Sequence, residues 1–389
     1  MVTAARTSAP PTVTPCVNAT HGDPVEVPPM RPPTDPAEHG TLPGASERPD
    51  PVRHPHGLPR GLPRRSRLVA AGAAALITVA VLGTVISVGG KDGGPGPSVP
   101  LSGGKHEPGV TSLPWPREGQ AAVRVEGFGD RGDLGTHGPN RPVPIASVTK
   151  VMTAYVILRD HPLRRSESGP RITVDRQAAD ESVSGIESSV PVTQGQRLSQ
   201  RRLLELMLVP SGNNIARLLA RWDAGSQEAF VGKMNRTAAG LGMTRTTYTG
   251  ASGFEPTTTS TAADQLKLAR QVMRDELFRS VVAQSHTVVP GTSRTLDNTN
   301  ALLDTPGVVG IKTGSSTPAG GALMWAVTVP DRRGRQHLAL GVVLHQRAGT
   351  SPQEGLRTVF DCSRALVEAV RSQVATAPSP TVDVASGSR

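Results

Sequence analysis

The chain has 389 residues, a formal net charge of +10 at pH 7, two cysteines and ten histidines. The histidines lack the H-E-x-x-H spacing of a zinc site and two distant cysteines cannot build a cysteine-based one, so we expect no metal and no cofactor. The basic balance suits an anionic cell-envelope surface or general solubility. The sequence has no basic-aromatic pattern, which argues against nucleic acid as a partner.

The N-terminal region divides into a polar tail and an apolar run. Residues 1–66 are rich in Pro and Gly and lack apolar periodicity, which predicts a disordered tail. Residues 68–88 contain no charge, and a helix of that length reaches about 31 Å, enough to cross a bilayer core. Arg60, Arg64, Arg65 and Arg67 precede the run, so the tail should stay in the cytoplasm and the rest should be exported.

We therefore predict a single-pass cell-membrane protein with a transmembrane signal anchor at residues 67–88. A cleaved signal peptide is the competing interpretation, although no good A-x-A site follows the apolar run. The Arg64-Arg65 pair is also compatible with a twin-arginine export signal. In the predicted topology Cys16 and Cys362 lie on opposite sides of the membrane and cannot pair.

The exported part should comprise a Gly/Pro-rich linker (residues 89–118), a folded domain (119–374) and a loose tail (375–389). Apolar and β-branched runs predict strands in two groups, at 121–128 and 143–145 and then at 308–312, 322–329 and 338–345. Helical periodicity predicts helices at 147–159, 198–208, 214–222, 227–240 and 262–272, and a closing helix from about 352. This order predicts an α+β domain with a helical insertion in an antiparallel sheet.

The first motif with chemical content is Ser147-Val148-Thr149-Lys150. Positions i and i+3 share one face of a helix, so the Ser147 hydroxyl and the Lys150 amine can meet. The first turn of a helix favours developing negative charge, and a lysine with a lowered pKa can accept the proton of a serine nucleophile. The same spacing also occurs at Ser102 and Lys105, in the predicted linker, so the motif alone is weak.

Two further motifs follow. Ser211-Gly212-Asn213 lies between two predicted helices, where a hydroxyl can relay a proton and an amide can both donate and accept hydrogen bonds. Read alone, it is more simply a turn and a helix cap.

Lys312-Thr313-Gly314 lies at the end of a predicted strand, where a cation and a hydroxyl suit a carboxylate and glycine allows close approach of a ligand. Read alone, it is more simply a strand that ends in a turn.

The joint occurrence of SxxK, SxN and KTG in this order is typical of penicillin-binding proteins and class A β-lactamases. Residues 119–389 contain 27 Arg and only 4 Lys, yet two of the lysines are those of the motifs. The segments PIASVTKVMTAYVIL, LMLVPSGNNIA, GASGFE…TTSTAADQLKLAR, NTNALL and VVGIKTGSSTPAGG resemble the S11 family of D-alanyl-D-alanine carboxypeptidases, which are low-molecular-mass penicillin-binding proteins. The resemblance covers nearly the whole predicted domain.

The resemblance implies a five-stranded antiparallel sheet flanked by helices, an all-helical lobe, and an active site in the groove between them. It implies that Ser147 attacks the carbonyl of the penultimate D-alanine of a peptidoglycan stem peptide, that Lys150 accepts the proton, and that Ser211 relays a proton to the leaving D-alanine. The N–H groups of Ser147 and Ser315 would form the oxyanion hole.

For substrate binding, the resemblance implies that Asn213 positions the peptide amide and that Lys312, Thr313 and Gly314 bind the end of the peptide that carries the carboxylate. A β-lactam would mimic the substrate and acylate the serine, so penicillins are expected covalent inhibitors. The implied activity is the trimming of stem peptides during cell-wall synthesis, which affects cell shape.

The sequence departs from the family in the segment after the last core strand. Family members often carry an arginine after the last core strand that helps to bind the carboxylate, and here the segment reads HQRAGTSPQEGLR. Arg347 and Arg357 are the candidates, and the sequence does not select between them.

Three alternatives stay open. A class A-like β-lactamase would need an acidic residue in an E-x-x-L-N pattern, which is not evident. A DD-endopeptidase or transpeptidase would use the same three motifs. A non-catalytic penicillin-binding sensor would fit the long tail and the basic segment beside the membrane.

Overall fold

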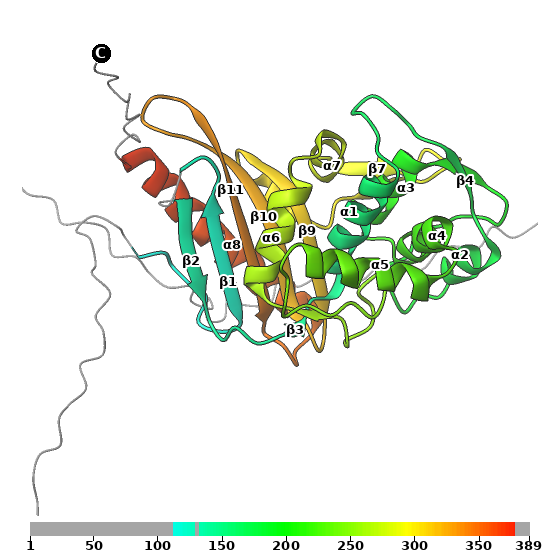
Figure 1. The fold of residues 1–389 in the computed structure, drawn as a ribbon, viewed down its shortest axis with the longest axis horizontal. Helices are drawn as coiled ribbons and strands as arrows, with labels where there is room; N and C mark the ends of the chain where they lie inside the picture. Colours follow the sequence, from blue (N-terminus) through cyan, green and yellow to red (C-terminus); the bar gives the residue numbers. More distant parts are fainter. Residues whose placement is uncertain (1–111, 129–131, 378–389) are drawn as a thin grey trace, which may run out of the picture. The chain divides into compact units, whose positions relative to one another are not determined.

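A five-stranded antiparallel sheet forms the centre of the part that the computed structural model describes, residues 112–128 and 132–377 (Figure 1). Its strand order is β2-β1-β11-β10-β9, so segments from both ends of the domain pair with each other. The predicted sheet is confirmed. Its strands are β1 (Gln120–Val125), β2 (Asp133–His137), β9 (Val308–Ser316), β10 (Gly320–Pro330) and β11 (Gln336–Gln346).

The sheet differs from the sequence prediction at three places. β2 was not predicted, because the sequence DLGTH has only one large apolar residue and its side chains are half-buried or exposed at the edge of the sheet. The predicted strand at 143–145 is the short β3 (Val143–Pro144), which pairs with β6 (Thr259–Ser260) outside the main sheet. β9 continues past Lys312 to Ser316, so Lys312-Thr313-Gly314 lies within a strand rather than at its end.

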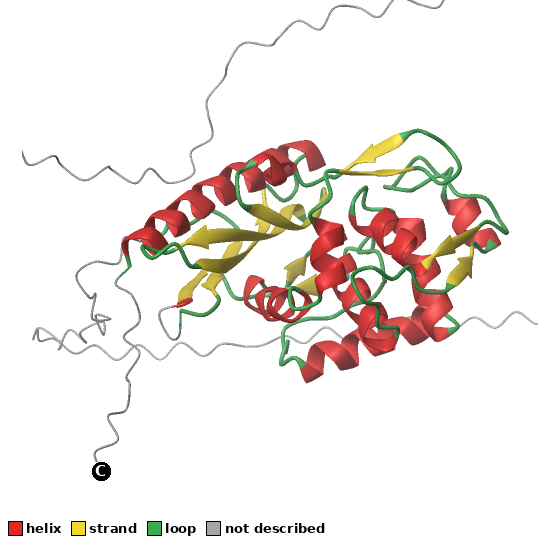
Figure 2. Ribbon diagram, turned by 90° about the horizontal axis from the view of Figure 1, so that it is seen from above, coloured by secondary structure: helices red, strands yellow, loops and turns green. Residues whose placement is uncertain are grey.

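Helices cover both faces of the sheet (Figure 2), and each face carries a separate hydrophobic core. Trp325 of β10 belongs to the core beneath the closing helix α8 (Pro352–Thr376), together with Val359 and Leu366 of that helix. Met324, one residue earlier, belongs to the core shared with the helices, because successive side chains of a strand point to opposite faces. α6 (Ala262–Val272) packs on β1 and β11 on that second face.

The remaining helices form a lobe beside the β9 edge of the sheet (Figure 1). Two side-chain caps explain why the predictions of 227–240 and 262–272 are correct: Ser226 accepts a hydrogen bond from the Ala229 amide, and Thr261 accepts one from the Asp264 amide. The lobe contains α1 (Lys150–Asp160), α2 (Arg176–Glu181), α3 (Gln200–Leu208), α4 (Asn213–Ala224), α5 (Gln227–Gly240) and α7 (Glu276–Val282).

The expectation of an all-helical lobe needs a correction, because two short ribbons connect its helices. They are β4 (Arg171–Thr173) with β5 (Arg197–Ser199), and β7 (His286–Val288) with β8 (Thr295–Asp297). Each ribbon has only three residues per strand, too few for a period-two pattern to stand out from the sequence.

Part of the segment that was expected to be a linker packs on the domain, since Leu113 is buried and the Trp115 ring stacks on His137. Within the described ranges, none of the helices is both long and apolar enough to span a bilayer. The predicted tail at 1–66 and the predicted anchor at 67–88 lie outside the described residues, as does most of the predicted linker and C-terminal tail.

Candidate active site

Ser147 and Lys150 meet at the start of the first long helix. Ser147 lies in a 3₁₀ turn, Ala146–Thr149, and Lys150 is the first residue of α1. Side chains three residues apart are eclipsed in a 3₁₀ turn, which brings the Lys150 Nζ to 2.8 Å from the Ser147 Oγ. The sequence predicted that the Ser147 and Lys150 side chains meet on an α-helix that begins at residue 147. The structure shows the contact, but it places Ser147 in a 3₁₀ turn before the α-helix.

The Lys150 amine is fully buried and has two other partners. It donates to Asn213 Oδ1 at 2.5 Å and to the Ser252 carbonyl oxygen at 2.8 Å. A neutral amine has two N–H groups, so these two acceptors satisfy both of them. Its lone pair is then left for the third partner, the hydroxyl proton of Ser147.

The electrostatic surroundings favour this neutral form. Burial lowers the pKa of Lys150 well below its ordinary value, and the positive charges of Lys312 and Arg217 lower it further. The carboxylates of Glu187 and Glu255 act in the opposite direction and are smaller effects. An uncharged amine within hydrogen-bond reach of a serine hydroxyl is the arrangement that general-base activation of a nucleophile requires.

The Ser211-Gly212-Asn213 motif supplies one of these acceptors. Asn213 is the first residue of α4, and its side chain reaches Lys150 as described. Ser211 has a positive φ of 69°, a conformation that is costly for a residue with a side chain. Its Oγ is buried and has no hydrogen-bond partner among the described residues. A strained, unpaired hydroxyl is available to a bound substrate.

The Lys312-Thr313-Gly314 motif brings a second buried amine to the site from β9. Lys312 Nζ lies 3.1 Å from the Thr299 Oγ1 and 3.3 Å from the Thr313 Oγ1, and the two threonine hydroxyls are 2.6 Å apart. Burial lowers the pKa of Lys312 to about 7. The amine has no carboxylate partner among these contacts, so it is suited to binding an anionic group from outside.

Gly314 sets the distance between β9 and the nucleophile. A Cβ on Gly314 would lie 2.8 Å from the Ile145 carbonyl oxygen and 3.0 Å from the Ser147 amide nitrogen, both closer than ordinary contacts. The strand can therefore approach the serine turn only because this residue is glycine. Ser315 is the next residue of β9, so it lies directly after the point where the strand approaches the serine turn.

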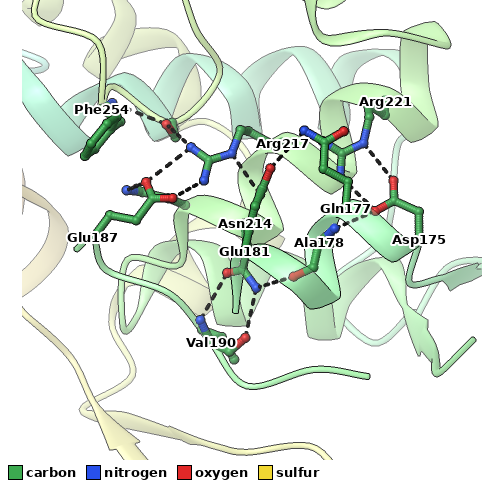
Figure 3. Close-up of polar contacts among 12 residues, drawn as sticks. Asp175, Gln177, Ala178, Glu181, Glu187, Val190, Asn214, Arg217, Arg221 and Phe254 are labelled. Atoms are coloured by element: carbon green, nitrogen blue, oxygen red, sulfur yellow. Dashed lines mark hydrogen bonds and ion pairs between the residues drawn. The ribbon is translucent and has the colours of Figure 1, made fainter. Parts of the chain in front are cut away.

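Several residues of the site were not found from the sequence. Ser252 and Thr299 lie in the family-like segments GASGFE and NTNALL, but neither was assigned a role, since Ser252 offers only its backbone carbonyl to Lys150 and Thr299 acts through a single hydroxyl. Glu187 accepts a hydrogen bond from Asn213 Nδ2 at 2.6 Å and pairs with Arg217 (Figure 3). These are long-range contacts, and spacing in the sequence gives no signal for them.

The two candidate carboxylate-binding arginines differ in position. Arg347 follows β11, and its guanidinium lies 2.7 Å from the Glu354 carboxylate. Arg357 is exposed on α8, the helix that covers the sheet face opposite α6 (Figure 2). Neither is assigned to the site.

Comparison with known proteins shows the family to which the chain belongs. Residues 134–343, just over half of the chain, match the peptidase S11 family, described as D-alanyl-D-alanine carboxypeptidase. The chain belongs to this family. It is therefore a serine hydrolase of the DD-peptidase type, with the α+β fold that the order of its elements and its family resemblance predicted.

Individual relatives agree with the family. The chain is 34% identical to a D-alanyl-D-alanine carboxypeptidase of a Streptomyces species over 47% of this chain and 67% of that protein. It is 34% identical to a D-alanyl-D-alanine endopeptidase of Pseudomonas aeruginosa over 50% of this chain and 63% of that protein. The chain thus spans about two thirds of the length of these relatives.

The fold also matches a solved structure. The crystal structure of a Streptomyces DD-transpeptidase superimposes with a TM-score of 0.54 and 27% identity, covering 64% of this chain and 96% of that one.

Replacement of Gly314 by Ala should slow acylation of Ser147 without unfolding the domain. The added methyl group pushes β9 away from the serine turn, and misplacement of this size in an active site costs about 10- to 100-fold in rate. The measurement is the second-order rate constant for labelling by a fluorescent penicillin. Gly232→Ala, within α5, is the matched control and should keep the wild-type rate. Wild-type labelling of Gly314→Ala would refute the close approach.

Proposed function

We propose that the protein is a serine-type D-Ala-D-Ala carboxypeptidase that trims peptidoglycan stem peptides through an acyl-enzyme at Ser147. The observation that carries this proposal is the buried Lys150 amine, 2.8 Å from the Ser147 Oγ with both of its N–H groups accepted elsewhere. Ser147 attacks the carbonyl carbon of the penultimate D-alanine, and Lys150 takes the hydroxyl proton. The peptide C–N bond then breaks and D-alanine leaves with a proton relayed by Ser211.

The other motif residues have binding roles in this proposal. Asn213 positions the peptide amide through the hydrogen-bonding capacity of its side chain that neither Lys150 nor Glu187 uses, such as the second N–H of Nδ2. Lys312 and Thr313 bind the terminal carboxylate, and Gly314 permits the approach of the strand. The N–H groups of Ser147 and Ser315 stabilise the oxyanion, since developing charge is best met by preorganised donors. Water finally hydrolyses the ester at Ser147.

A DD-endopeptidase is the second candidate, and the similarity to the Pseudomonas aeruginosa endopeptidase favours it. It would use the same residues on a cross-linked peptide. A β-lactamase is less well supported, because Glu187, the carboxylate bonded to Asn213, is already paired with Arg217 and is a poor base for a deacylating water. A non-catalytic penicillin sensor would need the Ser147 ester to persist.

We also propose that the chain is anchored in the cell membrane through residues 68–88, with residues 1–66 in the cytoplasm and the enzyme domain outside. The uncharged run and the four arginines before it support this topology. Protease treatment of intact cells should remove the domain and spare an epitope fused to residue 1. Recovery of the whole protein in the soluble fraction would contradict the anchor.

Replacement of Ser147 by Ala should abolish both penicillin labelling and release of D-alanine from a pentapeptide ending in D-Ala-D-Ala. The wild-type domain should release D-alanine and turn over penicillin slowly. Release from a cross-linked dimer but not from the pentapeptide would favour the endopeptidase. Stable labelling with no release would favour the sensor, and activity in the Ser147→Ala protein would refute the assignment.

The catalytic efficiency for a carboxylate-ended peptide should fall as the pH rises above about 7. Burial lowers the pKa of Lys312 to about 7, so at higher pH its amine loses the positive charge that attracts the carboxylate. The value of kcat/KM should decrease about tenfold per pH unit well above this pKa. A matched peptide amide has no carboxylate and should not show this decrease. An equal decrease for both substrates would contradict the role of Lys312.

A further inference from the structure

A buried ion pair joins Glu187 and Arg217 (Figure 3), next to residues that contact Lys150. Arg217 is one turn after Asn213 on α4, and Glu187 comes from the segment between α2 and β5. Only 9% of each side chain is exposed. Glu187 also accepts the Asn213 Nδ2 hydrogen bond at 2.6 Å. Arg217 in turn donates to Ser252 Oγ at 3.3 Å and pairs with Glu181 at 2.9 Å.

This pair therefore contacts both residues that accept the N–H groups of Lys150. Asn213 accepts through Oδ1 and Ser252 through its backbone carbonyl. An ionised carboxylate can only accept hydrogen bonds, so Glu187 requires the NH₂ end of the Asn213 amide to face it. The oxygen end of the amide is then turned toward Lys150. If the amide were reversed, it would present a donor to Lys150 and remove one acceptor.

We propose that the Glu187–Arg217 pair is a positioning device for acylation, which fixes the Asn213 amide and the Ser252 segment so that the Lys150 lone pair faces Ser147. The proposal rests on the proposed function in its assignment of Lys150 as the base. Neither Glu187 nor Arg217 touches the reacting atoms, so both act through Asn213 and Ser252.

The pair also gives two opposed charges next to the base. Arg217 lowers and Glu187 raises the pKa of Lys150, while Lys312 from β9 lowers it and Glu255 raises it. Loss of the Glu187 charge leaves the cations in excess and lowers the Lys150 pKa. Loss of the Arg217 charge leaves the carboxylates in excess and raises it. In the proposed mechanism the neutral amine is the active form, so the rate should rise with pH as Lys150 loses its proton. This rise, the acid limb of the pH–rate profile, should move to lower pH in the first case and to higher pH in the second.

The test is the second-order rate constant for acylation by a fluorescent penicillin, measured from pH 5 to 9 in the full chain. Glu187→Gln keeps an acceptor for Asn213 and should keep the maximal rate within about threefold while the acid limb moves to lower pH by about one pH unit. Glu187→Ala loses the acceptor as well, and its maximal rate should fall about 10- to 100-fold. Arg217→Met should move the acid limb to higher pH.

The matched control is Arg221→Met. Arg221 lies one turn further along α4 and makes a bidentate pair with Asp175, at 2.7 and 2.9 Å, that holds α2 on α4 (Figure 3). A purely structural role would give Arg217→Met and Arg221→Met similar losses of thermal stability with unchanged pH profiles. The proposal requires that only the variants of Glu187 and Arg217 change the profile.

Two results would overturn the proposal. One is an unshifted acid limb in Glu187→Gln, a variant of nearly the same shape in which Arg217 still pairs with Glu181. The other is a wild-type maximal rate in Glu187→Ala. Release of D-alanine is measured in parallel: acylation without release would refute the carboxypeptidase function, while the comparison of the acid limbs would still decide this proposal.

Discussion

The burial of one lysine amine against one serine hydroxyl is the interaction on which the rest of this site depends. Burial lowers the pKa of Lys150 well below its ordinary value and the neighbouring cations lower it further, which favours the neutral form that a base requires. Its two N–H groups need acceptors in the same interior, and Asn213 and Ser252 provide them. In the neutral form the lone pair of the amine then faces Ser147, as the proposed mechanism requires.

The fold can be understood as the means of bringing three chain segments to this amine. The 3₁₀ turn and α1 carry the serine and lysine, the start of α4 carries the asparagine, and β9 carries the second lysine along the edge of the sheet. Glycines at the contacts permit the close approach. Gly314 lies against the serine turn, and Gly253, in the left-handed region at φ 79°, lies against the Ala146 carbonyl beside it. A side chain at either position would separate the segments.

Much of the fold could be predicted because it is encoded by local patterns. The helices at 227–240 and 262–272 have side-chain caps and clear apolar periodicity, and the late strands are continuous buried runs. β2 could not be predicted, since an edge strand with few apolar residues has no such pattern. The three motifs gave the main site residues, whereas Glu187, Ser252 and Thr299 reach the site only through tertiary contacts.

The protonation state of Lys150 tests the account most directly. The chain has only six lysines, so a titration of the protein labelled with ¹³C at lysine Cε, followed by NMR and assigned with a Lys150→Met variant, can resolve this one. The account predicts that the Lys150 signal is that of a neutral amine at pH 7.5. A signal that titrates near the ordinary value of 10.5 would contradict it, because the amine would then be protonated and unable to accept the proton of Ser147.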